Sequence, residues 1–212
     1  MKAAWPFEPG EATRALTLAD AELGELIARV GPFSLEPKPT RSTFEALARS
    51  IVFQQLSGKA ASTIWGRVEA AHPQGRLAPE ALLALSDATL RSAGLSGAKL
   101  RALRDLATRT VGGEIPTPAK LRTMDEEAIV ETLTRVRGIG RWSVEMMLIF
   151  RLARPDVLPV TDLGIRKGFQ RTFGMRTLPA ERTLTRRGER WRPYRTVASW
   201  YLWRALDVPV VL

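Results

Sequence analysis

The stretch VRGIGRW has a composition that suits the binding of an anion. Gly138 and Gly140 permit a tight turn with positive φ, and the apolar Ile139 between them can pack between two helices. The amide N–H groups of such a turn would lie at the N-terminus of the next helix, where the helix dipole favours negative charge. Two flanking side chains, Arg137 and Arg141, add positive charge. The alternative is a glycine-containing corner between two helices that binds nothing.

The composition narrows the chemistry that a catalytic site could use. The sequence has no cysteine and one histidine, His72. These counts exclude disulfides, thiolate metal ligands and cysteine nucleophiles, and they leave little basis for a histidine-dependent triad or a zinc site with several histidines. Catalysis would therefore depend on carboxylates, amines or hydroxyls.

Asp162, in PVTDLGI, is a carboxylate at the predicted start of a helix over residues 162–173. Thr161 is available as the N-cap of this helix, and the helix dipole would favour the negative charge of Asp162. From spacing alone, the simplest interpretation is that Asp162 stabilises the start of the helix, because aspartate is common there.

Positive charge is concentrated in the second half of the chain. The net charge is +10, and residues 101–212 hold 21 basic and 12 acidic side chains, against 11 and 10 in residues 1–100. A surface of this sign is a natural partner for phosphate groups. Charge alone fits equally well with an arginine-rich surface that has no such partner, so it supports nucleic-acid binding only together with a motif.

Helix signals recur along the chain, whereas strand signals are almost absent. Ser42 with Glu45 forms a capping box, and Ser57 and Ser96 can cap the helical stretches that follow them. Apolar residues at helical spacing predict one further helix on each side of the glycine turn, at 125–136 and 141–153. We therefore expect an all-α protein.

The chain of 212 residues is long enough for one large domain or two small ones. We expect a single functional unit with two helical subdomains, at 42–111 and 119–205, and with residues 1–41 packed as an N-terminal helical segment. No apolar run approaches the roughly 18 residues of a membrane span, and the N-terminus lacks the apolar stretch of a signal peptide. A cytoplasmic protein that acts at the nucleoid, with no membrane partner, is expected.

Three motifs in the same order along the chain resemble those of a known enzyme family. They are IVFQQLSGKAASTIWGR, then VRGIGRW followed by PVTDLGI, and finally WRPYRTVASWYLWRAL. Together they resemble the 3-methyladenine DNA glycosylase II (AlkA-type) family of helix–hairpin–helix DNA glycosylases. The resemblance implies two helical subdomains with a cleft for DNA and the damaged base between them. Longer members carry an N-terminal β domain, and the 41 residues before Ser42 are too few to form one.

The resemblance assigns roles to particular residues. Asp162 corresponds to the catalytic aspartate, which reverses its interpretation as a helix cap. The base pocket would consist of Trp142, Met146, Trp200 and Tyr201, with Trp200 stacking on the base, whereas core packing is favoured for Trp203. DNA would be bound by Gln54, Gln55, Leu56, Leu95, Arg137, Gly138, Ile139, Gly140, Arg141 and Lys167. Among these, Gln55 or Leu56 would fill the gap left by a flipped base, and Leu95 would be a second wedge.

The implied reaction suits a single carboxylate. Cleavage of an N-glycosidic bond builds positive charge on the deoxyribose, so a carboxylate can stabilise that charge and orient or deprotonate water. A base such as 3-methyladenine or 7-methylguanine is itself cationic, leaves without protonation and is attracted by an aromatic wall. Related glycosylases that also cut the strand carry a lysine where this chain has Trp142, so hydrolysis without strand cleavage is expected.

The resemblance implies double-stranded DNA with damaged bases as partner, repair of alkylation damage by base excision as the process, and a monomer. No cofactor is expected, although backbone carbonyls of Thr134, Val136 and Ile139 could hold Na⁺ or K⁺ in the hairpin. Met146 and Thr161 replace a tyrosine and an aspartate of the family, which predicts a more open pocket. Two alternatives stay open: a non-catalytic helix–hairpin–helix DNA-binding protein, and a glycosylase with strand-cleaving lyase activity.

Overall fold

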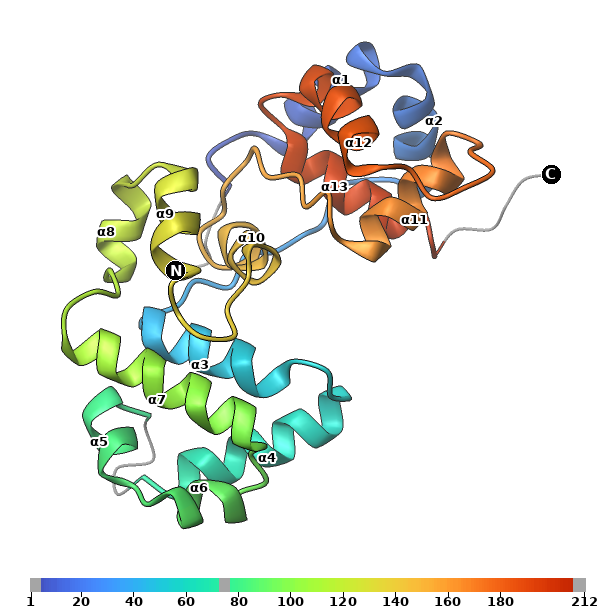
Figure 1. The fold of residues 1–212 in the computed structure, drawn as a ribbon. Helices are drawn as coiled ribbons and strands as arrows, with labels where there is room; N and C mark the ends of the chain where they lie inside the picture. The colour runs from blue at the N-terminus through green and yellow to red at the C-terminus, as the bar shows by residue number, and fades with distance from the viewer. Residues whose placement is uncertain (1–4, 73–76, 208–212) are drawn as a thin grey trace. The chain divides into compact units, whose positions relative to one another are not determined.

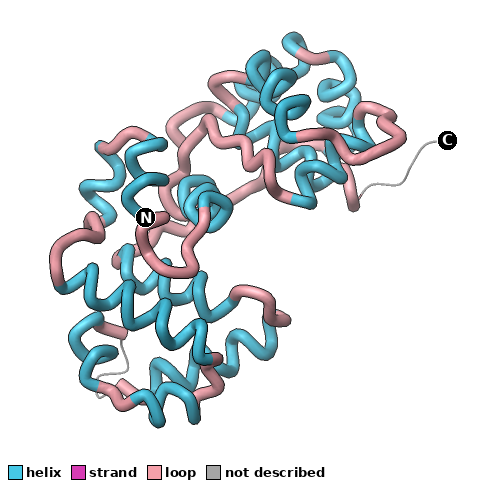
Figure 2. The backbone as a smooth tube through the Cα atoms, in the orientation of Figure 1, coloured by secondary structure: helices cyan, strands magenta, loops and turns pink. Residues whose placement is uncertain are grey.

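The computed structural model describes residues 5–72 and 77–207, and all regular structure within these ranges is helical (Figures 1 and 2). The all-α prediction is therefore confirmed. The chain forms two compact units. One comprises Thr40–Met147, and the other combines the chain up to Pro39 with the chain from Leu148 onward. No helix in the described ranges is long and apolar enough to cross a bilayer.

The continuous unit, Thr40–Met147, is built around the longest of its helices, α7 (Gly97–Val111), which packs against α3, α5 and α6 (Figure 1). Buried leucines along α7 and the apolar face of α3 form much of the contact. The other helices of this unit are α3 (Thr43–Phe53), α4 (Gly58–Ala70), α5 (Pro79–Ala84), α6 (Asp87–Ser92), α8 (Pro118–Thr123), α9 (Glu126–Leu133) and the first part of α10 (Arg141–Phe150).

The second unit is centred on α13 (Arg195–Arg204), which is buried on nearly all sides and packs against α1, α2 and α11. Its remaining elements are α1 (Pro9–Ala19), α2 (Ala21–Val30), α11 (Leu163–Thr172), α12 (Glu181–Gly188), the short 3-10 helix η1 (Glu189–Trp191) and the end of α10. The N-terminal segment forms α1 and α2, which contribute Leu16 and Leu23 to this core.

Helix starts follow the predicted caps. The side chains of Ser42, Ser57 and Ser96 accept hydrogen bonds from the third residue of α3, α4 and α7, respectively. The prediction that Thr161 is the N-cap of this helix is wrong, because Asp162 itself caps α11 and accepts a hydrogen bond from the Ile165 N–H. The helix after the glycine turn ends at Phe150, earlier than predicted.

The division of the chain differs from the predicted subdomains at 42–111 and 119–205. Helices α8 and α9 and the glycine turn belong with Thr40–Met147, whereas Asp162 lies in the other unit. Hydrogen bonds explain this grouping: the Asp105 carboxylate of α7 accepts the Arg137 N–H at 2.8 Å, and the Gln54 amide donates to the Gly138 carbonyl at 2.8 Å. The turn is thus fastened to α7 and to the end of α3.

A buried ion pair joins the two sequence segments of the second unit. The Asp20 side chain is fully buried, caps α2, and accepts two 2.7 Å hydrogen bonds from Arg187 and one of 3.0 Å from Trp191 Nε1. Burial alone would raise the pKa of Asp20, but these hydrogen bonds and the charge of Arg187 outweigh it, so the pKa lies below its usual value. Arg187 also lies 3.7 Å from the centre of the Phe173 ring.

Asp20→Asn should lower the free energy of unfolding at pH 7 by about 3 kcal/mol, because it leaves Arg187 without its buried countercharge. Since the folded-state pKa is depressed, this stabilisation is present above the ordinary aspartate pKa and is lost as pH falls through the folded-state value. Denaturant unfolding at pH 7 and at pH 3 measures the difference, which should shrink at the lower pH. Asp87→Asn is the matched control, since Asp87 pairs with Arg104 at the surface and should contribute less than about 1 kcal/mol. Equal losses for both variants would contradict this account.

Candidate functional site

The Asp162 carboxylate is held by two N–H donors that meet on one oxygen. Its Oδ1 accepts from the Ile165 backbone N–H at 2.8 Å and from Trp203 Nε1 at 2.9 Å. The first donor comes from the opening turn of α11 and the second from α13, so two packed helices orient the carboxylate. Because both bonds end on the same atom, rotation of the carboxylate would break both.

The Trp203 indole is itself fixed in place. Its ring stacks on Phe150, with centroids 5.8 Å apart and an interplanar angle of 22°. Gly164 also lies against this indole: an added Cβ there would stand 2.9 Å from Trp203 Cδ1 and 3.0 Å from Asp162 Oδ1. These distances are shorter than normal contacts, so only glycine leaves room for the indole to reach the carboxylate.

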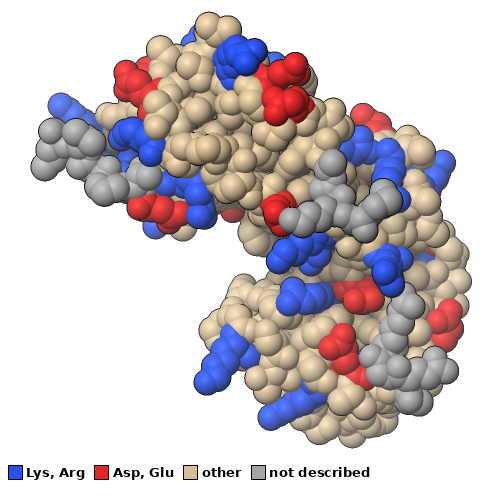
Figure 3. All heavy atoms as spheres, turned by 180° about the vertical axis from the view of Figure 1, so that it is seen from behind, with Lys and Arg blue, Asp and Glu red and all other residues tan. Residues whose placement is uncertain are grey.

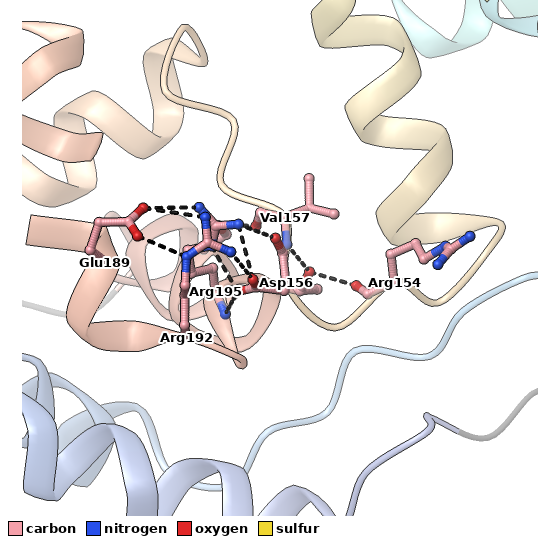
Figure 4. Close-up of polar contacts among 8 residues, drawn as sticks. Arg154, Asp156, Val157, Glu189, Arg192 and Arg195 are labelled. Carbon is pink, nitrogen blue, oxygen red and sulfur yellow. Dashed lines mark hydrogen bonds and ion pairs between the residues drawn. The ribbon is translucent and has the colours of Figure 1, made fainter. Parts of the chain in front are cut away.

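The loop that leads to Asp162 is clamped to the start of α13 (Figure 4). Arg195 donates to the Asp156 carboxylate at 2.7 and 3.0 Å, and Arg192 donates to it at 2.5 Å. Nearby, Thr196 Oγ1 donates to the Arg154 carbonyl at 2.6 Å and accepts the Val157 N–H at 3.0 Å. The loop and the helix that carries Trp203 are therefore one rigid assembly.

The glycine turn forms the predicted helix–hairpin–helix between α9 and α10. Gly138 has φ +78°, whereas Gly140 needs no positive φ, and Ile139 is buried between the helices. The Ile139 N–H donates to the Val136 carbonyl at 3.1 Å, and the Val144 N–H donates to the Gly140 carbonyl as α10 begins. The turn therefore precedes the N-terminus of α10, as an anion site would require.

The two arginines beside this turn have different hydrogen-bond partners. Arg141 forms a two-pronged ion pair with Glu127 at 2.9 and 2.6 Å, which raises the pKa of Arg141. This pairing reduces the charge that Arg141 offers to an anion, so the prediction that it binds DNA gains no support. The Arg137 side chain is exposed, but the backbone N–H of Arg137 already donates to the Asp105 carboxylate. Figure 3 shows further Lys and Arg side chains on the surface of both units.

A surface cavity of about 430 Å³ lies within the continuous unit, between the end of α3 and the start of α10. Trp142, which is 44% exposed, is its largest side chain, and Met146 is half-buried one turn further along α10. The exposed Gln55, with φ +55°, also lines the cavity and is followed by Leu56, which is 39% exposed. The lining residues are Ser50, Phe53, Gln54, Gln55, Gly138, Gly140, Trp142 and Ser143.

Two predicted base-pocket residues are core residues in the structure. Tyr201 is fully buried, its hydroxyl donates to the Gly31 carbonyl at 2.9 Å, and burial raises its pKa to about 12. Trp200 is 9% exposed and packs edge-on against Phe33, with the two ring centroids 5.1 Å apart. Trp200 therefore packs in the core, and Trp203, for which core packing is expected, packs against that core and also donates to the Asp162 carboxylate.

The prediction of Leu95 as a wedge is also wrong. Leu95 is 3% exposed, because the turn between α6 and α7 has the same construction as the glycine hairpin. Gly94 has φ +104° and precedes the buried Leu95, as Gly138 precedes the buried Ile139. Leu95 therefore plugs the gap between its two helices and is not exposed to a partner.

The basic residues Arg166 and Lys167 of α11 have different surroundings. Arg166 Nε donates to the Pro179 carbonyl at 3.1 Å, which directs the guanidinium to the segment before α12. Lys167 is exposed and lines a shallow concavity with Gln170 and Arg171. His72, the single histidine, is buried and bonds to the Val68 carbonyl through Nδ1, so it is a core residue.

Residues that position the site were missed by the sequence reasoning. Gly164 and Trp203 shape the surroundings of Asp162, while Lys99 and Asp105 of α7 hold the loop after α3 and the hairpin. A tryptophan three residues beyond Trp200 was visible as a second aromatic residue on the same helix. Nothing in its spacing distinguished a residue that contacts the carboxylate from one that packs in the core.

The sequence and the fold of this chain are similar to those of known proteins. The profile of a family described as HhH-GPD superfamily base excision DNA repair protein matches residues 48–193. The chain is 34% identical to DNA-3-methyladenine glycosylase 1 of Schizosaccharomyces pombe over 93% of this chain and 90% of that protein. A DNA-3-methyladenine glycosidase structure from Bacillus halodurans superposes with a TM-score of 0.83 at 35% identity, covering 97% of this chain and 91% of that one. The S. pombe 3-methyladenine DNA glycosylase in complex with abasic DNA matches with a TM-score of 0.79 at 33% identity, covering 93% and 97%.

Gly164→Ala should lower the free energy of unfolding by about 1–3 kcal/mol, because the new methyl group overpacks against the indole and the carboxylate. Gly66→Ala in α4 is the matched control. Position 66 is exposed with nothing near its Cβ, so alanine should stabilise the protein by about 0.5–1 kcal/mol through helix propensity. Thermal unfolding of both variants measures the two effects. An unchanged or increased stability of Gly164→Ala would show that the indole is not confined as described.

Proposed function

Because the chain belongs to the HhH-GPD superfamily of base excision DNA repair proteins, we infer that it is a DNA glycosylase that hydrolyses the N-glycosidic bond of alkylated bases in double-stranded DNA. The observation that carries this proposal is the Asp162 carboxylate, oriented by Ile165 and Trp203 at the start of α11. The names of the relatives support 3-methyladenine as a substrate. We propose 7-methylguanine as a second substrate, because it is also an alkylated purine with a positive charge.

Asp162 supplies the negative charge that the reaction needs. As the bond between C1′ and the base nitrogen breaks, its electron pair leaves with the base and positive charge develops on the sugar. A carboxylate about 4 Å from a unit charge, at an effective dielectric constant of about 20, contributes about 4 kcal/mol. That is roughly a thousandfold in rate. Water then adds to C1′, and the carboxylate orients it or accepts its proton.

The leaving base needs little help from an acid. A base alkylated on a ring nitrogen carries a positive charge and becomes neutral as it leaves, so no general acid has to protonate it. Trp142 offers an exposed aromatic face in the 430 Å³ cavity, and aromatic faces attract cations. Preference for cationic over neutral damaged bases is consistent with these features.

The hairpin and the basic surface bind the DNA backbone. The turn at Gly138–Gly140 precedes the α10 N-terminus, where backbone N–H groups and the helix dipole favour a phosphate. A net charge of +10 adds attraction that does not depend on base sequence. Gln55 and Leu56, exposed beyond α3, are suited to fill the space left by a flipped base.

The reaction ends at an abasic site. Position 142, directly after the hairpin arginine, is a tryptophan, which cannot form a Schiff base with the sugar. We further propose that the reaction needs no cofactor and that the protein acts as a monomer in the cytoplasm. A monovalent cation would suit the hairpin carbonyls of Thr134, Val136 and Ile139. Of these, the Val136 oxygen already accepts the Ile139 N–H and keeps a second lone pair for such an ion.

Asp162→Asn should slow base release about a thousandfold, because the amide keeps the shape of the side chain and lacks its charge. Single-turnover release of 7-methylguanine from duplex DNA measures the rate, and gel analysis of the wild-type product should show intact strands until alkali is added. Affinity for a duplex with an abasic analogue should persist in the variant. Undiminished base release would contradict the proposal. Wild-type binding of DNA with no release from any alkylated duplex would favour a non-catalytic DNA-binding protein.

A further inference from the structure

Two adjacent glutamines after α3 have different environments. Gln54 is half-buried, and its side-chain amide donates to the Gly138 carbonyl at 2.8 Å. Gln55 is exposed and has φ +55°, a conformation that residues other than glycine rarely adopt. With Leu56, these residues form the Gln54–Leu56 loop. Only one of its two amides is thus engaged with the hairpin.

The Gln54–Leu56 loop is also held from α7. The Lys99 ammonium donates to the Val52 carbonyl at 2.7 Å and to the Gln54 carbonyl at 2.8 Å, which satisfies acceptors at the C-terminal end of α3. Burial lowers the pKa of Lys99. A cation at the C-terminus of a helix is favourable, so Lys99 holds the backbone that leads into the loop.

The hairpin is fastened to the same helix. Asp105, six residues after Lys99 on α7, accepts the Arg137 N–H at 2.8 Å and is itself bonded by Arg109 at 3.2 Å. An added Cβ on Gly138 would lie 3.4 Å from the Cβ of Ala102, so the turn rests on α7. The hydrogen bond from Gln54 to Gly138 closes a ring of contacts that runs through α7, the loop and the turn.

We infer that Gln54 is a positioning residue that couples the Gln54–Leu56 loop to the hairpin, and that it does not itself enter the DNA. The inference rests on the proposed function. The carbonyl that it binds belongs to the peptide between Gly138 and Ile139, inside the turn that would hold a phosphate. A phosphate bound at the turn therefore fixes the place from which Gln55 and Leu56 reach the duplex. Binding of a DNA phosphate at the hairpin is therefore coupled to insertion of Gln55 or Leu56 into the space left by the flipped base.

Gln54→Met tests the coupling, because methionine keeps the length of the side chain and removes the donor. Gln170→Met is the matched control: the Gln170 amide also donates to a backbone carbonyl, that of Arg176 at 3.3 Å, and it lies in the other unit. Affinities are measured for an undamaged duplex and for one with a tetrahydrofuran abasic analogue. Gln54→Met should reduce the preference for the abasic duplex roughly 3- to 10-fold, as expected for one lost hydrogen bond, with unchanged affinity for undamaged DNA. Gln170→Met should change neither affinity.

A second measurement separates positioning from a structural role. Leu56→Ala should reduce the preference of the wild-type protein for the abasic duplex. The reduction should be smaller when Gln54→Met is already present, because the loop is then no longer hydrogen-bonded to the hairpin. In the Gln170→Met background the effect of Leu56→Ala should be the same as in the wild type. Should Gln54→Met fail to fold, Gln54→Glu serves instead, since the ratio of affinities cancels the uniform effect of its added charge on phosphate binding.

Three results would overturn the coupling. They are an equal loss of affinity for both duplexes in Gln54→Met, an unchanged abasic preference, and full additivity with Leu56→Ala. A wild-type protein with no preference for the abasic duplex would instead count against the proposed function. The two failures are therefore distinguishable.

Discussion

The Ile165 N–H and the Trp203 indole N–H converge on a single oxygen of Asp162, and this constraint fixes the carboxylate on which the proposed reaction depends. A carboxylate at a helix start is common and usually does no more than cap the helix. Here the cap is shared with a second helix, so the packing of α11 on α13 determines where the negative charge lies. A charge placed in advance costs no reorganisation when positive charge develops on a substrate, and this is the usual source of electrostatic catalysis.

The rest of the second unit makes that placement rigid. Asp156, Arg192 and Arg195 tie the loop before Asp162 to the start of α13. The buried Asp20–Arg187 pair joins the N-terminal segment to α12, and α13 is buried on nearly all sides. In the other unit, α7 has the corresponding role for the hairpin and the Gln54–Leu56 loop. Each unit thus uses one central helix to fix the parts that would meet DNA.

Much of the fold follows from local signals in the sequence. The serine caps and the glycine hairpin are short-range patterns, and both are present in the structure. The environments of individual side chains, in contrast, depend on contacts between residues that are far apart in the sequence, so local spacing does not predict them. Trp200 and Trp203 differ by three positions on one helix, and only the approach of Phe33, Phe150 and Gly164 decides which indole reaches the carboxylate. Likewise, Arg141 is engaged by Glu127, and Leu95 is buried because a second hairpin encloses it.

The most direct test of the central claim is the rate of 7-methylguanine release by Trp203→Phe, measured in the wild-type and in the Asp162→Asn background. Phenylalanine keeps the stacked ring and removes the donor. A hydrogen bond to a charged group contributes about 1.5–3 kcal/mol, so the single substitution should slow release roughly 10- to 150-fold. In the Asp162→Asn background it should add little, because the charge that it orients is gone. The same slowing in both backgrounds, or none in either, would contradict the claim that Trp203 acts through Asp162.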